Sequence, residues 1–139
     1  MHPERTAEVD RVRPRRGRTV LRLSLVGIVA DQATLILQAR DGGQAEMRLP
    51  ADSCGGRFQV RNPLDALATA CTARDWIRDL YLDAGTEGEL LRVGRHPDVI
   101  SGDKGIFLCP AQHAAGVRVQ LYCTVSDNVS IACAREEKR

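Results

Sequence analysis

The sequence predicts an α+β fold: an antiparallel β-meander of about three strands, one long helix, then three to four more antiparallel strands. Two observations lead to this prediction. Apolar and polar residues alternate in several short segments, as in strands with one buried face, whereas residues 62–83 have a broad apolar face at helical spacing. We expect a bent sheet, or a partly closed barrel, packed on the helix.

Composition excludes several classes of protein. A chain of 139 residues fits one compact domain. With 43% hydrophobic and 27% charged residues it is neither a disordered nor a fibrous chain. Aromatic residues make up only 4%, too few for a platform that stacks nucleic-acid bases. The apolar runs are far shorter than the ~20 residues that span a bilayer, and no secretory leader is recognisable, so we expect a bacterial-type cytoplasmic protein.

The positive charge is concentrated at the start of the chain. Residues 1–18 hold six arginines and three acidic residues, a net charge of +3, whereas the rest of the chain carries −1. Pro3, Pro14 and Gly17 interrupt this segment. The sequence therefore predicts a flexible basic arm over 1–18, a single domain over 19–134 and a charged tail over 135–139.

The first half of the domain is expected to form the meander and the helix. Alternating apolar residues predict strands at 19–29, 33–40 and 44–49, with a hairpin turn at Asp41-Gly42-Gly43 and a loop over 51–62. Asn62 is a typical helix N-cap and Pro63 a typical first helical residue, so a helix is predicted to run from there to about Asp83.

The second half is expected to return to strands. The predicted segments are 88–94, 105–109, 116–125 and 128–134. The alternation over 116–125 is the clearest in the chain, and it places Cys123 on the same apolar face as Cys133 of the following strand. Five cysteines, an odd number without CxxC spacing, indicate reduced thiols.

The charged segments indicate a partner. Arginine side chains fork onto carboxylates and phosphates, and the arm contributes Arg11, Arg13, Arg15, Arg16 and Arg18. The predicted helix carries an acidic ridge of Asp75, Asp79 and Asp83, on which the arm of a second copy would fit. We therefore expect a non-enzymatic binding or adaptor domain whose arm engages an acidic protein, a second copy of itself in a homo-oligomer, or a polyanion. Nucleic-acid binding through the arm is a third possibility, and no membrane contact is expected.

The main alternative is a small-ligand pocket or small enzyme between the sheet and the helix. Its polar residues would be Cys54, His96, Asp98, Asp103 and His113, with Cys54 as the thiol and a histidine as its base. Cys109 and His113 form a C-x3-H pair, but a structural zinc site needs four ligands, usually in two such pairs. The sequence therefore predicts no catalytic set, no metal site and no cofactor.

Overall fold

Strands make up nearly all of the molecule. The computed structural model describes residues 5–40, 46–69, 75–85, 90–95, 108–124 and 128–136. Of these residues 72% lie in strands and 6% in one short helix. The predicted α+β class with one long helix is therefore wrong.

Seven of the strands close into a barrel. The elements in chain order are β1 (Thr6–Arg15), β2 (Arg18–Val26), β3 (Ala33–Ala39), β4 (Met47–Cys54), β5 (Arg57–Pro63), α1 (Leu64–Thr69), β6 (Asp75–Asp83), β7 (Leu90–Arg95), β8 (Gln112–Ala114), β9 (Val117–Cys123) and β10 (Val129–Arg135). The barrel has the order β3-β4-β5-β2-β1-β7-β6 and closes through pairing of β6 with β3. Among the described pairings only β1 with β7 is parallel.

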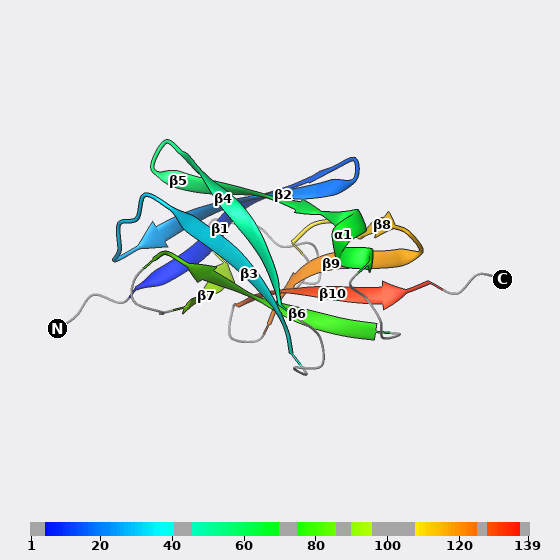
Figure 1. Ribbon diagram of the computed structural model, residues 1–139. Coiled ribbons are helices and arrows are strands. Elements are labelled where there is room, and N and C mark those ends of the chain that lie inside the picture. Colours follow the sequence, from blue (N-terminus) through cyan, green and yellow to red (C-terminus); the bar gives the residue numbers. More distant parts are fainter. Residues whose placement is uncertain are drawn as a thin grey trace.

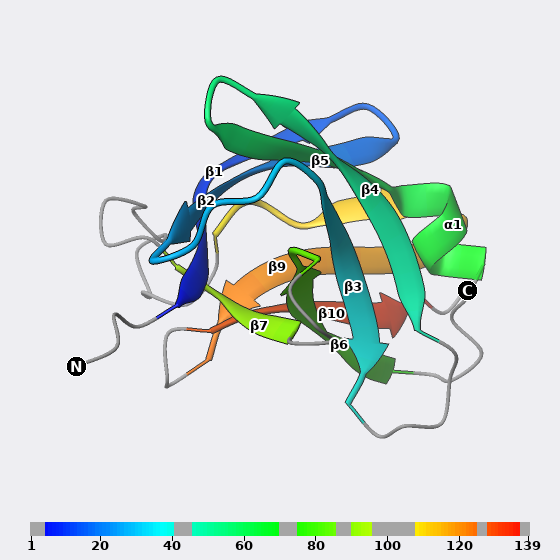
Figure 2. The same cartoon turned by 60° about the vertical axis from the view of Figure 1, so that its left-hand side comes forward.

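A second sheet branches from the barrel at β6. One edge of β6 pairs with β3, while its other edge pairs first with β10 and then with β7. β10, β9 and β8 continue outward from there. In Figure 1, β5 and β2 form the upper wall and β6 and β10 lie below. The turned view shows β3 beside β4 in front, with β9 and β10 running across behind them (Figure 2).

The core follows from alternation along these strands, since successive side chains of a strand point to opposite faces. β2 buries Leu21 and Leu23, and β5 buries Phe58 and Val60. At one end of the barrel, α1 packs against β2, β5 and β8 (Figure 1). This helix of six residues buries the side chains of Leu64, Leu67 and Ala68.

Residues 62–83 do not form the one long helix that was predicted. They form the end of β5, the short helix α1 and the strand β6, and residues 70–74 between α1 and β6 lie outside the described residues. Arg78 misled the helical reading, because it points inward at 1% exposure between the buried residues Trp76 and Leu80. An inward arginine hides the period-two pattern of a strand. The side chain of Asn62 also makes no cap, since both of its polar atoms are buried without a hydrogen-bond partner.

The predicted basic arm is also wrong as a description of residues 6–18, which form β1 and the turn into β2. A β-bulge concealed β1, because the register with β2 shifts between Val9 and Arg11. Val9 and Val12 both lie on the inner side, yet they stand three residues apart instead of two or four. Pro14 is tolerated because the described strands leave one edge of β1 unpaired at that position.

The strand positions were predicted better than their connections. Strands were correctly expected around β3, β7, β9 and β10. The meander is wrong, because β2 pairs with β1 and β5 and has no ladder with β3. The predicted loop 51–62 instead forms the end of β4, a tight turn and β5. The turn at 41–43 and residues 105–107 of the predicted 105–109 strand lie outside the described residues, while Leu108 and Cys109 are described and belong to no strand.

Candidate functional site

Seven arginines on the outer side of three adjacent strands, together with Arg16 in the turn between two of them, form the arginine face. The register of β1, β2 and β5 places their outward positions in neighbouring rows. Because the inner side of each strand is apolar, the alternating outer positions remain for charged side chains. The arginine face consists of Arg11, Arg13, Arg15, Arg16, Arg18, Arg22, Arg57 and Arg61.

Two cross-strand pairs in this face join like charges. Arg11 lies directly opposite Arg22, and Arg15 lies directly opposite Arg18. Like charges in opposed positions of an antiparallel pair destabilise a sheet, by an amount comparable to the ~0.2–1 kcal/mol of a favourable pair. The free protein thus has to accommodate repulsion that an anion bound to this surface would relieve.

Asp10 is the acidic residue held within this surface. It is the bulged residue of β1, and its side chain is only 9% exposed. Its carboxylate accepts a hydrogen bond from Arg22 Nε at 2.6 Å and another from the Ser24 hydroxyl, and it lies 3.2 Å from Arg57 Nε. Burial disfavours the charged carboxylate, but the Ser24 hydrogen bond and the two guanidinium groups outweigh it and lower the pKa of Asp10.

Most of the other arginines make no ion pair with another described residue. Arg15 donates to the carbonyl of its neighbour Pro14 at 3.2 Å. Within the described ranges, side-chain hydrogen bonds and ion pairs engage none of the following: Arg11, Arg13, Arg16, Arg18 and Arg61.

A hollow of about 170 Å³ lies in the arginine face, between β1, β2 and the turn that joins β4 to β5. Cys54 is exposed at this turn, where Gly55 and Gly56 both have positive φ. The hollow is lined by Arg11, Arg13, Val20, Arg22, Cys54 and Gln59.

The tip of the β1–β2 hairpin is fixed to the rest of the fold. Gln112 of β8 donates from Nε2 to the carbonyls of Arg15 and Arg18, both at 3.0 Å, and accepts a hydrogen bond from the Thr19 hydroxyl. The amide of Leu64 donates to the carbonyl of Gly17 at 3.1 Å. These contacts hold the arginines of the tip on a rigid support.

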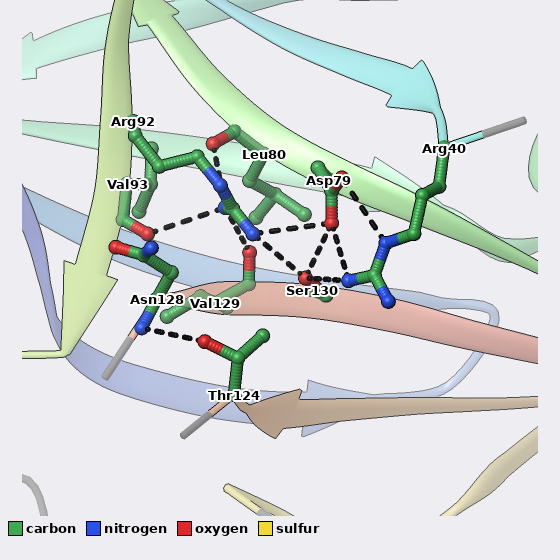
Figure 3. A network of polar contacts seen from close by, with 9 residues as sticks. All are labelled: Arg40, Asp79, Leu80, Arg92, Val93, Thr124, Asn128, Val129 and Ser130. Atoms are coloured by element: carbon green, nitrogen blue, oxygen red, sulfur yellow. Dashed lines mark hydrogen bonds and ion pairs between the residues drawn. The ribbon is translucent and has the colours of Figure 1, made fainter. Parts of the chain in front are cut away.

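The expected acidic ridge is not a helical face, and its central residue is already neutralised within the chain (Figure 3). Asp79 Oδ1 lies 2.8 Å from Arg40 Nη2 and 3.1 Å from Arg92 Nη2, and it accepts a hydrogen bond from the Ser130 hydroxyl at 2.7 Å. Burial raises the pKa of Asp79, but these hydrogen bonds and charges exceed that effect, so its pKa is lowered. Asp83 accepts a hydrogen bond from the amide of Gly85 at 2.9 Å. The side chain of Asp75 is outside the description.

The residues of the predicted pocket or enzyme are not brought together where they are described. Cys54 lines the hollow without the other candidates, and His113 Nδ1 lies 2.6 Å from Glu136 Oε1 on the surface. A second hollow of about 410 Å³ lies over β6, β10 and β9 and contains none of those candidates. The remaining candidates lie outside the described residues: His96, Asp98 and Asp103.

The cysteines give no metal or disulfide site in the described part of the chain. Burial raises the pKa of the Cys109 thiol, against a smaller opposing effect of a hydrogen bond with the Leu121 backbone, which disfavours the thiolate that a metal needs. The described ranges hold no group of three or more ligating side chains. Cys123 lies opposite Val129, and Cys133 lies opposite Val119, so the two thiols are not cross-strand partners.

Sequence reasoning missed the residues that organise the arginine face. Asp10, Ser24 and Gln112 stand far apart along the chain and match no motif, so only the strand register brings them to the arginines. The outward alternation of Arg18, Val20 and Arg22 was the signal that extended the site beyond residue 18.

None of the described helices has the length and apolar character needed to cross a membrane.

Comparison with known proteins identifies the fold and not a family. No family model matches the chain, and no curated protein matches its sequence. Several solved structures share the fold, among them two of S. aureus TarS. The crystal structure of S. aureus TarS superposes with a TM-score of 0.71 at 16% identity, over 97% of this chain and 25% of that chain. A structure of S. aureus TarS 217–571 superposes with a TM-score of 0.69 at 17% identity, over 97% of this chain and 40% of that chain. This chain therefore resembles a part of TarS in fold and spans a quarter to two fifths of the matched chains.

Proposed function

We propose that this protein is a non-enzymatic binding domain that holds an anionic polymer on its arginine face. The observation that carries the proposal is the arrangement of seven outward arginines on β1, β2 and β5 and an eighth in the β1–β2 turn, with two like-charged cross-strand pairs. Guanidinium groups fork onto phosphate and carboxylate oxygens, so such a surface favours a partner with several negative charges.

The arginines are held in place before the partner arrives. The hairpin tip is bonded to Gln112 and to the amide of Leu64, and Asp10 holds Arg22. A preformed surface loses less conformational entropy on binding than a flexible arm that orders on contact. Charge complementarity would also accelerate the encounter with an anion at low ionic strength.

A polymer is favoured over a protein surface because the arginine face lacks apolar anchors. Protein interfaces usually depend on buried aromatic or large apolar residues. Among the described residues the exposed large hydrophobic side chains are Val26, Val29 and Leu90, and none belongs to the arginine face. A second copy of the chain is a poorer partner, since Arg40 and Arg92 already pair with Asp79.

We also propose a cytoplasmic location. Cys54, Cys109, Cys123 and Cys133 are free thiols, which is typical of a reducing compartment. Cysteine-specific labelling of the protein before and after reduction in cell extract tests this, with equal labelling expected.

The function is tested by polarisation of a fluorescent polyphosphate chain, with Arg13→Gln compared to Arg118→Gln. Both side chains are exposed on strands and make no described ion pair, but only Arg13 lies in the arginine face. Binding at low salt is expected to weaken about tenfold in Arg13→Gln and to stay near the wild-type value in Arg118→Gln. Absence of wild-type binding at low salt, or an equal loss in both variants, would overturn the proposal.

A further inference from the structure

We infer that the 170 Å³ hollow in the arginine face is a subsite for one phosphate group of the bound polymer. This inference rests on the proposed function and assigns a ligand chemistry to one part of the surface.

Three guanidinium groups border the hollow from two strands. Arg11 and Arg22 are opposed across the β1–β2 ladder, and Arg13 follows Arg11 on the same face two residues along β1. Opposed residues stand about 5 Å apart at Cβ, and same-face neighbours along a strand stand about 7 Å apart. The three side chains therefore surround a single small anion and do not each need a separate one.

Asp10 holds Arg22 at the hollow without saturating it. Its carboxylate takes the Nε–H of Arg22, and it lies beside Nε of Arg57. The terminal NH2 groups of Arg22 have no described partner and remain available to donate. Two further acids lie on this outer surface: Asp52, opposite Gln59 on the next strand, and Glu8, opposite Ser24. Four arginines (Arg11, Arg13, Arg22 and Arg57) against these three acids leave a local charge of +1.

The hollow is smaller than a pocket for a whole small molecule. Pockets for drug-sized ligands measure about 300–1,000 Å³, whereas this one measures about 170 Å³. Its size therefore suits a single phosphate group of a longer chain. The rest of the polymer would then extend toward Arg15, Arg16 and Arg18 at the hairpin tip.

Phosphate matches the three guanidinium groups better than carboxylate does. A carboxylate has two oxygens in one plane, with about four acceptor positions, and a single negative charge. A phosphate group has further acceptor oxygens arranged tetrahedrally, and a terminal one carries a charge of about −1.5 to −2 at neutral pH. Donors that arrive from Arg11, Arg13 and Arg22 in different directions therefore find more acceptor positions and more negative charge on a phosphate than on a carboxylate.

Cys54 supplies a readout inside the hollow. Its thiol is exposed and lines the same space, whereas Cys109 is partly buried and Cys123 and Cys133 are buried. The experiment measures the rate at which iodoacetamide, a neutral reagent, alkylates Cys54 by peptide mass spectrometry. The added anions are inorganic phosphate, polyphosphate and polyglutamate, each against sodium chloride of equal ionic strength.

The subsite predicts that inorganic phosphate and polyphosphate slow alkylation of Cys54 saturably, polyphosphate at lower concentration because it also reaches the hairpin tip. Polyglutamate is expected to leave the rate near the chloride value. Arg11→Gln should raise the phosphate concentration for half-protection about tenfold or more, while Arg118→Gln, exposed on β9 outside the arginine face, should leave that concentration unchanged. Arg11→Lys, which keeps the charge without the fork, should also lose protection by phosphate.

Three results overturn the inference in distinguishable ways. If polyglutamate protects Cys54 as well as polyphosphate does, the assignment to phosphate is wrong and the proposed function stands. If polyphosphate binds while the Cys54 rate is unchanged, the hollow is not part of the site. If neither polymer binds the wild-type protein, the proposed function and the subsite both fail.

Discussion

Arg92 of β7 reaches across the point where β6 changes partners and lies 3.1 Å from Asp79 through Nη2. Its Nη1 also donates to the carbonyls of Leu80 at 3.1 Å and Val129 at 2.6 Å (Figure 3). One side chain thus joins β6, β7 and β10 where the barrel meets the second sheet. We infer that this contact is a structural clamp and not part of the ligand surface.

The clamp predicts a large stability loss for Arg92→Met. The substitution removes one of the two guanidinium groups that hold the carboxylate of Asp79, and it removes the Arg92 donor from two carbonyls. The free energy of unfolding should therefore fall by about 2 to 3 kcal/mol. Arg40→Met removes the more exposed partner of the same carboxylate, whose side chain is 48% exposed, and should cost about 1 kcal/mol or less. Urea unfolding of both variants measures the difference, and an equal loss contradicts the clamp.

The lowered pKa of Asp79 predicts a specific pH dependence. A carboxylate with a folded pKa below its unfolded value, about 3.9, stabilises the fold above that value and loses this contribution as the pH falls through the folded pKa. Asp79→Asn should therefore be less stable than wild type by about 2 kcal/mol at pH 7, and the gap should shrink between pH 5 and pH 2. The pKa of Asp10 is also lowered, but Asp10 is present in both proteins, so its contribution cancels in the comparison. A gap that stays constant with pH would show that the charge of Asp79 contributes nothing.

Gln112 is expected to position the hairpin tip without touching the polymer. Gln112→Leu frees the carbonyls of Arg15 and Arg18, so the tip must order on binding. Affinity for polyphosphate should fall several-fold, while the slope of log K against log salt stays the same because no ionic contact is lost. The matched control is Gln120→Leu on the adjacent strand β9, whose amide donates to the carbonyl of Cys109 and not to the hairpin tip. A changed salt slope in Gln112→Leu would indicate direct contact with the ligand.

Replacement of Asn62 by an apolar residue is expected to preserve or raise the stability of the fold. Its side chain is fully buried and both polar atoms lack a hydrogen-bond partner, which costs about 1–3 kcal/mol of desolvation. Asn62→Leu should leave the unfolding free energy unchanged or raise it by about 1 kcal/mol. Thr19→Val, on the neighbouring strand, breaks the hydrogen bond with Gln112 and should lower it. A clear loss in Asn62→Leu would mean that the amide does have a partner, such as an internal water.

Strands were predicted from the sequence where apolar and polar residues alternate without interruption. They were missed where a buried charged residue interrupts that alternation. The period-two pattern of β9 is uninterrupted, and the strand was predicted. In β6 the buried guanidinium of Arg78 stacks 4.4 Å from the centre of the Trp76 ring and donates to the carbonyl of Leu37. The acidic spacing of Asp75, Asp79 and Asp83 misled further, because residues four apart share a face in a strand as well as in a helix.

The candidate site was predicted in part for a similar reason. The arginines of residues 11–18 were recognised by composition alone, since charge needs no fold to be counted. Their arrangement was not, because the bulge at Asp10 breaks the alternation of β1 and the supports from Ser24 and Gln112 arise only through tertiary pairing. The composition thus identified the cluster of arginines, whereas the strand pairing of the barrel determines on which surface these arginines lie.

The central claim is that the arginine face binds an anionic polymer through several simultaneous ionic contacts. The most direct measurement is the salt dependence of polyphosphate binding by the wild-type protein and by the double variant Arg13→Gln/Arg18→Gln. With about six contacts, wild-type affinity should fall about a thousandfold between 50 and 200 mM salt, and the variant should lose about one unit of log–log slope per arginine. Wild-type binding that does not depend on salt, or a slope that the double variant leaves unchanged, would contradict the account.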